Sequence, residues 1–130
     1  MKKKKILIVD SDLLSCRAYQ KLFEKKGFKV ECCIDGNECL EKANTGYGCI
    51  LVDTTNLAKL DGWHLVSELK NHDHVKNTPI VIFTSSTGDH YFEKAKEVGA
   101  DGFVFKFSPQ QVFEEVEKVL RGGVTKGNLH

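Results

Sequence analysis

Asp10 and Asp53 each end a short apolar run of the sequence, and Thr84 and Lys106 end two more. If these runs are parallel strands of one sheet, all four residues lie at the same edge, where ligand sites form. Carboxylates on neighbouring strands, whose backbones lie about 5 Å apart, repel each other unless a cation or a proton relieves them. Further polar residues follow at the same strand ends: Asp12, Thr54, Thr55, Ser85 and Ser86. The sequence therefore predicts a site where three acids, hydroxyls and one lysine meet.

Magnesium suits such a group of acids, because it prefers oxygen ligands and is commonly held by one or two carboxylates together with a phosphate. Transfer of a phosphoryl group to a carboxylate needs mainly positioning and neutralisation of the equatorial oxygens. A divalent ion and Lys106 would provide this neutralisation together, which makes Asp53 a candidate nucleophile.

The alternative interpretation is that acids at strand ends only cap helices and keep loops soluble. It is strong for Asp12, which can cap the next helix by accepting backbone N–H bonds. It is weaker for Asp10, Asp53 and Lys106 together, because chance rarely places all three at one sheet edge.

The elements that position these residues follow from the alternation of short apolar runs with amphipathic stretches, which predicts five βα units and a parallel sheet buried on both faces. The predicted strands are 5–9, 29–33, 49–52, 80–83 and 102–105.

Helical spacing predicts helices over about 13–26, 37–45 and 63–71, a fourth that carries Ala95, and a fifth that begins at Pro109 after a Ser108 cap. In the first helix, Leu14, Ala18 and Leu22 are predicted to form the core-facing stripe, with Tyr19 and Phe23 beside it.

Length and charge narrow the class of protein. The 130 residues fit one domain, expected over 1–121, with a flexible tail or linker over 122–130. With 19 basic and 18 acidic residues, the chain carries no broad charge for nucleic acid or an anionic membrane, so a protein partner is expected. The apolar runs are too short for a membrane span or a signal peptide. Five cysteines without a C-x-x-C motif indicate buried thiols of a reducing cytoplasm.

Six pieces of the chain carry a resemblance to a known family: Ile6-Leu7-Ile8-Val9-Asp10, Asp35-Gly36, Ile50-Leu51-Val52-Asp53, Asp61-Gly62, the stretch 79–85 and the stretch 99–106. In this order and at these spacings, they resemble the receiver domains of two-component signalling over roughly residues 4–121. The resemblance implies an α/β, flavodoxin-like fold: a doubly wound, five-stranded parallel sheet of order 2-1-3-4-5 with helices on both faces.

The same resemblance implies a role for each site residue. Asp53 is the implied phosphoacceptor, and Thr84, Lys106 and the aromatic Phe103 are the implied phosphate-binding and switch residues. The implied magnesium ligands are Asp10, Asp53, Asp12 and Thr55. The implied partners are a sensor histidine kinase or phosphotransfer protein and a downstream protein target, and the implied chemistry is limited to gain and loss of the domain's own phosphoryl group.

The chain departs from the family pattern at four places. Ser11 stands where a second acid usually contacts the metal, which predicts weak magnesium binding unless Asp12 reaches in. The loop before Asp61 is one residue longer than usual. Phe107 replaces the proline that normally follows the lysine, so no cis peptide is expected there. Phe103 replaces the more common tyrosine.

Two other functions compete with a phosphorylation switch. A pseudo-receiver would keep the fold as a docking module without responding to phosphate, and Ser11 and the altered loop before Asp61 favour it. The sequence Asp10-Ser11-Asp12 is also similar to the opening of haloacid-dehalogenase-type phosphatases. That family usually has Thr or Val where this chain has Leu14, so this function is the least favoured.

Overall fold

The computed structural model of the chain describes residues 4–54, 61–85, 89–106 and 108–122. Within these residues, five strands form one sheet of order β2-β1-β3-β4-β5, and every neighbouring pair is parallel. The strands are β1 (Lys5–Val9), β2 (Lys29–Cys33), β3 (Cys49–Asp53), β4 (Ile80–Thr84) and β5 (Gly102–Phe105). The predicted fold and strand order are confirmed, and β3 and β4 each extend one residue beyond the predicted end.

Five helices of the described chain connect and follow the strands: α1 (Leu13–Lys25), α2 (Gly36–Ala43), α3 (Gly62–Lys70), α4 (Asp89–Glu97) and α5 (Pro109–Leu120). Side-chain caps decide where several of them begin. The carboxylate of Asp35 accepts the backbone N–H of Glu38 at 2.9 Å, and that of Asp61 accepts the N–H of Trp63 at 2.8 Å. α2 and α3 therefore begin one residue earlier than predicted, at the glycine that follows each aspartate.

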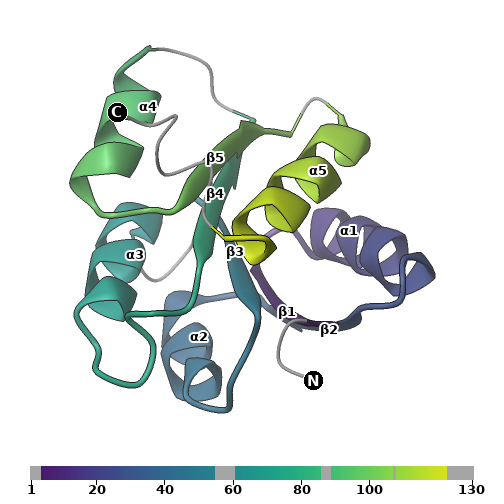
Figure 1. Cartoon of the computed structure of the whole chain (residues 1–130), viewed down its shortest axis with the longest axis horizontal. Helices are drawn as coiled ribbons and strands as arrows, with labels where there is room; N and C mark the ends of the chain where they lie inside the picture. The colour runs from purple at the N-terminus through teal and green to yellow at the C-terminus, as the bar shows by residue number, and fades with distance from the viewer. Residues whose placement is uncertain (1–3, 55–60, 86–88, 107, 123–130) are drawn as a thin grey trace.

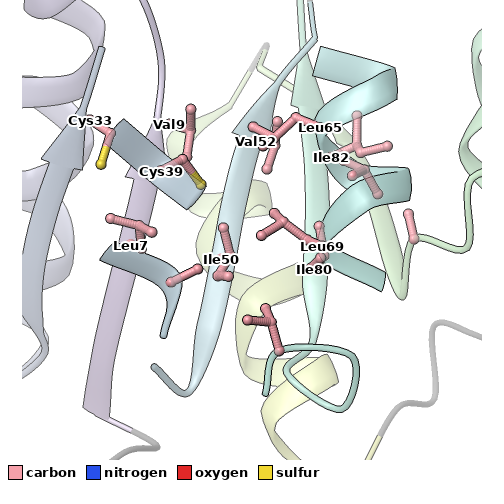
Figure 2. Close-up of a cluster of buried hydrophobic side chains, with 14 of the residues drawn as sticks. Leu7, Val9, Cys33, Cys39, Ile50, Val52, Leu65, Leu69, Ile80 and Ile82 are labelled. Carbon is pink, nitrogen blue, oxygen red and sulfur yellow. The ribbon is translucent and has the colours of Figure 1, made fainter. Parts of the chain in front are cut away.

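The sheet is covered on both faces (Figure 1), with α1 and α5 together on one side and α2, α3 and α4 on the other. Strand side chains alternate between two buried clusters, as the two-residue period of a strand requires. Figure 2 shows the cluster beneath α2 and α3, which includes Leu7, Val9, Ile50, Val52, Ile80 and Ile82. The opposite cluster, beneath α1 and α5, takes Ile6, Ile8, Leu51, Val81 and Phe83.

The predicted core stripe of α1 is wrong in part. Leu14 is 83% exposed and Ala18 is exposed, while Cys16, Tyr19 and Phe23 are the buried residues of this helix. Both stripes have helical spacing, but the observed stripe brings two aromatic rings against the sheet. Tyr19 packs edge-to-face on Phe83 with ring centroids 5.2 Å apart, and this larger apolar burial fixes the rotation of the helix.

Candidate functional site

Asp10 and Asp53 lie side by side at the carboxyl edge of the sheet. Val9 and Val52 are register partners in β1 and β3, so the residues that follow them are neighbours as well. Asp10 has no exposed surface, and Asp53 is 2% exposed. Two carboxylates in such a buried position need a compensating charge.

Lys106 supplies this charge from the position directly after β5. Its Nζ donates to Oδ2 of Asp10 and to Oδ2 of Asp53, each at 2.8 Å. The ammonium also lies 4.5 Å from the ring centroid of Phe83, a cation–π contact. Backbone pairing fixes this position, because the Lys106 N–H donates to the carbonyl oxygen of Thr84 at 2.9 Å.

The environment of Lys106 favours its charged form. Burial alone lowers the pKa of this amine, but the hydrogen bonds to Asp10 and Asp53 and the charges of both outweigh burial. The pKa of Lys106 is therefore raised above its usual value, and the amine is an ammonium at neutral pH.

A cavity of about 330 Å³ opens beside these residues, and we name it the acidic pocket. Residues that line it include Asp12, Ser15, Tyr19, Asp53, Ser85 and Lys106. Its walls thus combine two carboxylates, hydroxyl groups and a cation, which suits an oxyanion next to Asp53.

Sequence reasoning missed Ser15 and Tyr19 as pocket residues. Tyr19 was assigned only to the apolar side of the first helix, yet it borders both the core and the pocket. Burial raises the pKa of the Tyr19 phenol, and the nearby charge of Lys106 lowers it in part. A signal was present in the spacing of Asp12, Ser15 and Tyr19, which places all three on one helical face.

Asp12 caps α1, as the alternative interpretation of this residue predicts. Its Oδ1 accepts the N–H of Leu14 at 3.0 Å and that of Ser15 at 3.3 Å, and its own N–H donates to Oδ1 of Asp10 at 2.9 Å. Asp12 also lines the acidic pocket, so capping does not separate it from the site.

The other predicted site residues lie in different surroundings. Thr84 is fully buried at the end of β4, one position beyond the register partner of Asp53. Phe103 is half-buried in β5 and packs edge-to-face against Phe92 and Phe105, with centroids 6.0 and 5.1 Å away. Thr55 and Phe107, with the loop from 55 to 60, lie outside the described residues.

The donor set fits a hard cation. Oxygens of Asp10 and Asp53 converge on one cationic nitrogen, and carboxylate oxygens from neighbouring strands are what magnesium uses in proteins. Among the described residues, no group of three or more His, Cys, Asp or Glu side chains is placed to hold a metal ion. Asp10 and Asp53 could therefore supply two oxygen ligands for such an ion.

Comparison with known proteins places the chain in a family. The model of the response regulator receiver domain matches residues 6–117. The chain belongs to this family. Receiver domains of two-component response regulators act as phosphorylation-dependent switches, bind Mg²⁺ at their acidic pocket, and interact with histidine kinases or phosphotransfer proteins and with downstream effectors.

Individual relatives agree with the receiver assignment. Protein PilG of Pseudomonas aeruginosa is 32% identical over 117 residues, which cover 87% of this chain and 84% of PilG. The alkaline phosphatase synthesis transcriptional regulatory protein PhoP of Bacillus subtilis is 35% identical over 91% of this chain and 49% of PhoP. The CpxR homolog of Haemophilus influenzae is 30% identical over 95% of this chain and 53% of the homolog. The chain thus spans about half the length of several curated relatives that it matches.

Solved receiver structures have the same fold. The chemotaxis response regulator CheY4 of Vibrio cholerae has a TM-score of 0.81 at 28% identity, with 88% of this chain and 97% of that chain covered. A two-component response regulator from Clostridium difficile has a TM-score of 0.82 at 27% identity, with 92% of this chain and 97% of that chain covered. No helix in the described part of the chain is long and apolar enough to cross a membrane.

Proposed function

We propose that this receiver domain is a phosphorylation-dependent switch in which Asp53 accepts a phosphoryl group from a histidine kinase or a phosphotransfer protein. The observation that carries the proposal is the shared contact of Lys106 with Asp10 and Asp53 beside the acidic pocket. This arrangement holds a carboxylate nucleophile, a cation and space for a phosphoryl group next to one another.

The chain's own residues support each part of the transfer. A carboxylate oxygen of Asp53 attacks the phosphorus, the new oxygen–phosphorus bond forms, and the donor's bond to phosphorus breaks with its electron pair leaving on the donor. The Lys106 ammonium, now paired with Asp53, then pairs with a phosphoryl oxygen. Ser85, which lines the pocket, and Thr84, beside it in sequence, supply hydroxyl donors from the end of β4.

Asp10 and Asp53 would hold the magnesium ion, and Asp12 and Thr55 are the further predicted ligands. When bound, the ion supplies positive charge that neutralises the phosphoryl oxygens. Ser11 contributes no carboxylate, so we expect weaker binding than at a site with one more acid.

Backbone contacts link the site to the rest of the domain. Lys106 and Thr84 are joined by the hydrogen bond between β5 and β4, and Phe103 lies three residues before Lys106 on β5. Movement of Thr84 and Lys106 toward a phosphoryl group would therefore shift β5 and the aromatic contact of Phe103 with Phe92 on α4. We propose that the surface formed by α4 and β5 binds the downstream protein target.

Phosphorylation can be measured directly on the purified chain with acetyl phosphate and magnesium. We expect a mass gain of about 80 Da for one phosphoryl group, mapped to Asp53, and none in Asp53→Asn. Asp73→Asn is the matched control, because Asp73 is 90% exposed outside the pocket, and it should label like the wild type. Failure of the wild type to gain mass, with folding intact, would overturn the proposal and favour a phosphorylation-independent docking module.

A further inference from the structure

Two of the five cysteines face each other beneath the first helix. Cys16 on α1 is fully buried, and Cys32 on β2 is half-buried and packs against the same cluster. The Sγ of Cys32 lies 3.6 Å from the carbonyl oxygen of Cys16 and 3.7 Å from Oε1 of Gln20. Both cysteines are free, and the thiol of Cys32 lies against the backbone of Cys16.

Cys32 is the accessible member of this pair. It lines a surface groove of about 400 Å³ with Arg17, Gln20 and Glu38, separate from the acidic pocket. The hydrogen bond with Cys16 lowers the pKa of Cys32 against the effect of burial, and the charge of Arg17 lowers it further. The same pairing, together with burial, raises the pKa of Cys16. Cys32 therefore has both a lowered thiol pKa and access to solvent, the two properties that a reactive cysteine requires.

The remaining cysteines differ in both respects. Cys33 follows Cys32 on β2, so its side chain points to the opposite face, where Figure 2 shows it with Cys39 in the cluster beneath α2. Burial raises the pKa of Cys33 to about 12, and burial also raises that of Cys39 and Cys49. All three have no exposed surface, which makes them unreactive toward solutes.

We propose that Cys32 and Cys16 are a peroxide-sensitive modification site, in which Cys32 reacts with hydrogen peroxide and Cys16 resolves the product to a disulfide. The Cys32 thiolate attacks one peroxide oxygen, the O–O bond breaks, and the released hydroxide leaves as water after it takes up a proton. Cys16 then attacks the sulfenic sulfur, the S–S bond forms and a second water leaves. The two thiols together supply the two electrons that reduce the peroxide.

The position of Cys16 connects this pair to the acidic pocket. Its Sγ lies 3.8 Å from the carbonyl oxygen of Ile8, two residues before Asp10, and Ser15 beside it lines the pocket. The disulfide removes this S–H donor and draws α1 toward β2, because the sulfurs must close to about 2.05 Å. Asp12, whose N–H donates to Asp10, begins the same helix. Oxidation is therefore expected to displace one wall of the pocket.

The modification is tested on the full chain, treated with hydrogen peroxide and then with N-ethylmaleimide. We expect the wild type to lose about 2 Da, two hydrogen atoms, and, when it is unfolded for alkylation, to leave the two disulfide-bonded cysteines unmodified. Cys32→Ser should abolish this loss, and Cys16→Ala should stop at a sulfenic acid on Cys32 that dimedone traps. Cys33→Ser is the matched control on the neighbouring position and should behave like the wild type. A wild type without the loss, or a Cys32→Ser variant that retains it, would overturn the proposal.

A second measurement tests the connection to phosphorylation and rests on the proposed function. We expect the oxidised domain to take up acetyl phosphate at least about tenfold more slowly, since a 1 Å misplacement at a reacting site can cost on the order of 10²-fold, and dithiothreitol to restore the rate. Equal rates for the two forms would overturn the connection. If neither form labels, the proposed function fails, whereas the mass measurement still decides the disulfide.

Discussion

The Nζ of Lys106 lies 2.8 Å from Oδ2 of Asp10, whose side chain has no exposed surface. Asp53 is at the same distance from the same nitrogen, and its side chain is 3% exposed. One ammonium is therefore shared by two buried carboxylates in the folded domain. Removal of this ammonium leaves like charges together in a region of low dielectric, where they cost most.

Lys106→Met is expected to lower the free energy of unfolding by about 3–5 kcal/mol, because it leaves uncompensated buried charge. Urea denaturation without magnesium measures this loss. Lys42→Met is the matched control, since Lys42 pairs with Glu31 at a partly exposed position and such pairs contribute about 0–1 kcal/mol. Addition of Asp10→Asn to Lys106→Met should recover part of the loss. Equal losses in Lys106→Met and Lys42→Met would contradict the assignment of Lys106 as the charge partner of Asp10 and Asp53.

The raised pKa of Lys106 predicts how stability depends on alkaline pH. A group whose pKa is higher in the folded state contributes stability that is fully present below the unfolded pKa of about 10.4. That contribution is lost as the pH rises through the folded pKa. The difference in unfolding free energy between the wild type and Lys106→Met should therefore be constant from neutral pH to about 10 and then shrink. A constant difference across the alkaline range would disagree with the direction of the shift.

Capping and metal binding by Asp12 can be separated by two substitutions. Asp12→Ala removes the acceptor for the N–H groups of Leu14 and Ser15 and should cost about 0.5–2 kcal/mol of unfolding free energy. Asp12→Asn keeps an oxygen acceptor, so its stability should stay close to the wild type. The loss of charge should weaken magnesium binding in a calorimetric titration. Unchanged affinity in Asp12→Asn would remove Asp12 from the predicted ligands.

The strands could be predicted to within one residue of their bounds because β1, β3 and β4 are short apolar runs between helical stretches. Such runs fit only strands buried on both faces of a parallel sheet. The strand order came from the resemblance to receiver domains. The placement of Asp10, Asp53 and Lys106 at one edge follows from that topology alone. Their separation along the chain does not matter once the strand order is known.

The rotation of α1 could not be predicted, because two adjacent stripes of the helix both have apolar residues at helical spacing. The choice depends on contacts with Phe83 on β4 and Phe113 on α5, both distant in sequence. The pocket positions of Ser15 and Tyr19 depend on the same rotation, as does the contact of Cys16 with Cys32. The rotation of α1 is thus determined by tertiary packing, which no local sequence pattern encodes.

Gly102 is required by a close approach between β5 and α5. A Cβ atom at this position would lie 2.8 Å from Oε2 of Glu115, 3.2 Å from Val81 and 3.3 Å from Val119. Gly102→Ala is therefore expected to lower the free energy of unfolding by about 1–3 kcal/mol through overpacking. In a double-mutant cycle, Glu115→Ala should reduce the cost of Gly102→Ala, because it removes the nearest atom. Additive losses would show that the Glu115 side chain moves aside at little cost and that the overpacking comes from Val81 and Val119.

The observed rotation of α1 makes opposite predictions for two of its apolar residues. Leu14→Ser should change the unfolding free energy by less than about 0.5 kcal/mol, since the side chain is 83% exposed. Phe23→Ala should cost about 3–5 kcal/mol, because its ring is fully buried and packs on Phe28 and Phe113. Chemical denaturation of the two variants measures both values. A costly Leu14→Ser beside a tolerated Phe23→Ala would mean that the helix presents its other stripe to the sheet, and the acidic pocket would then lose Tyr19 as a wall.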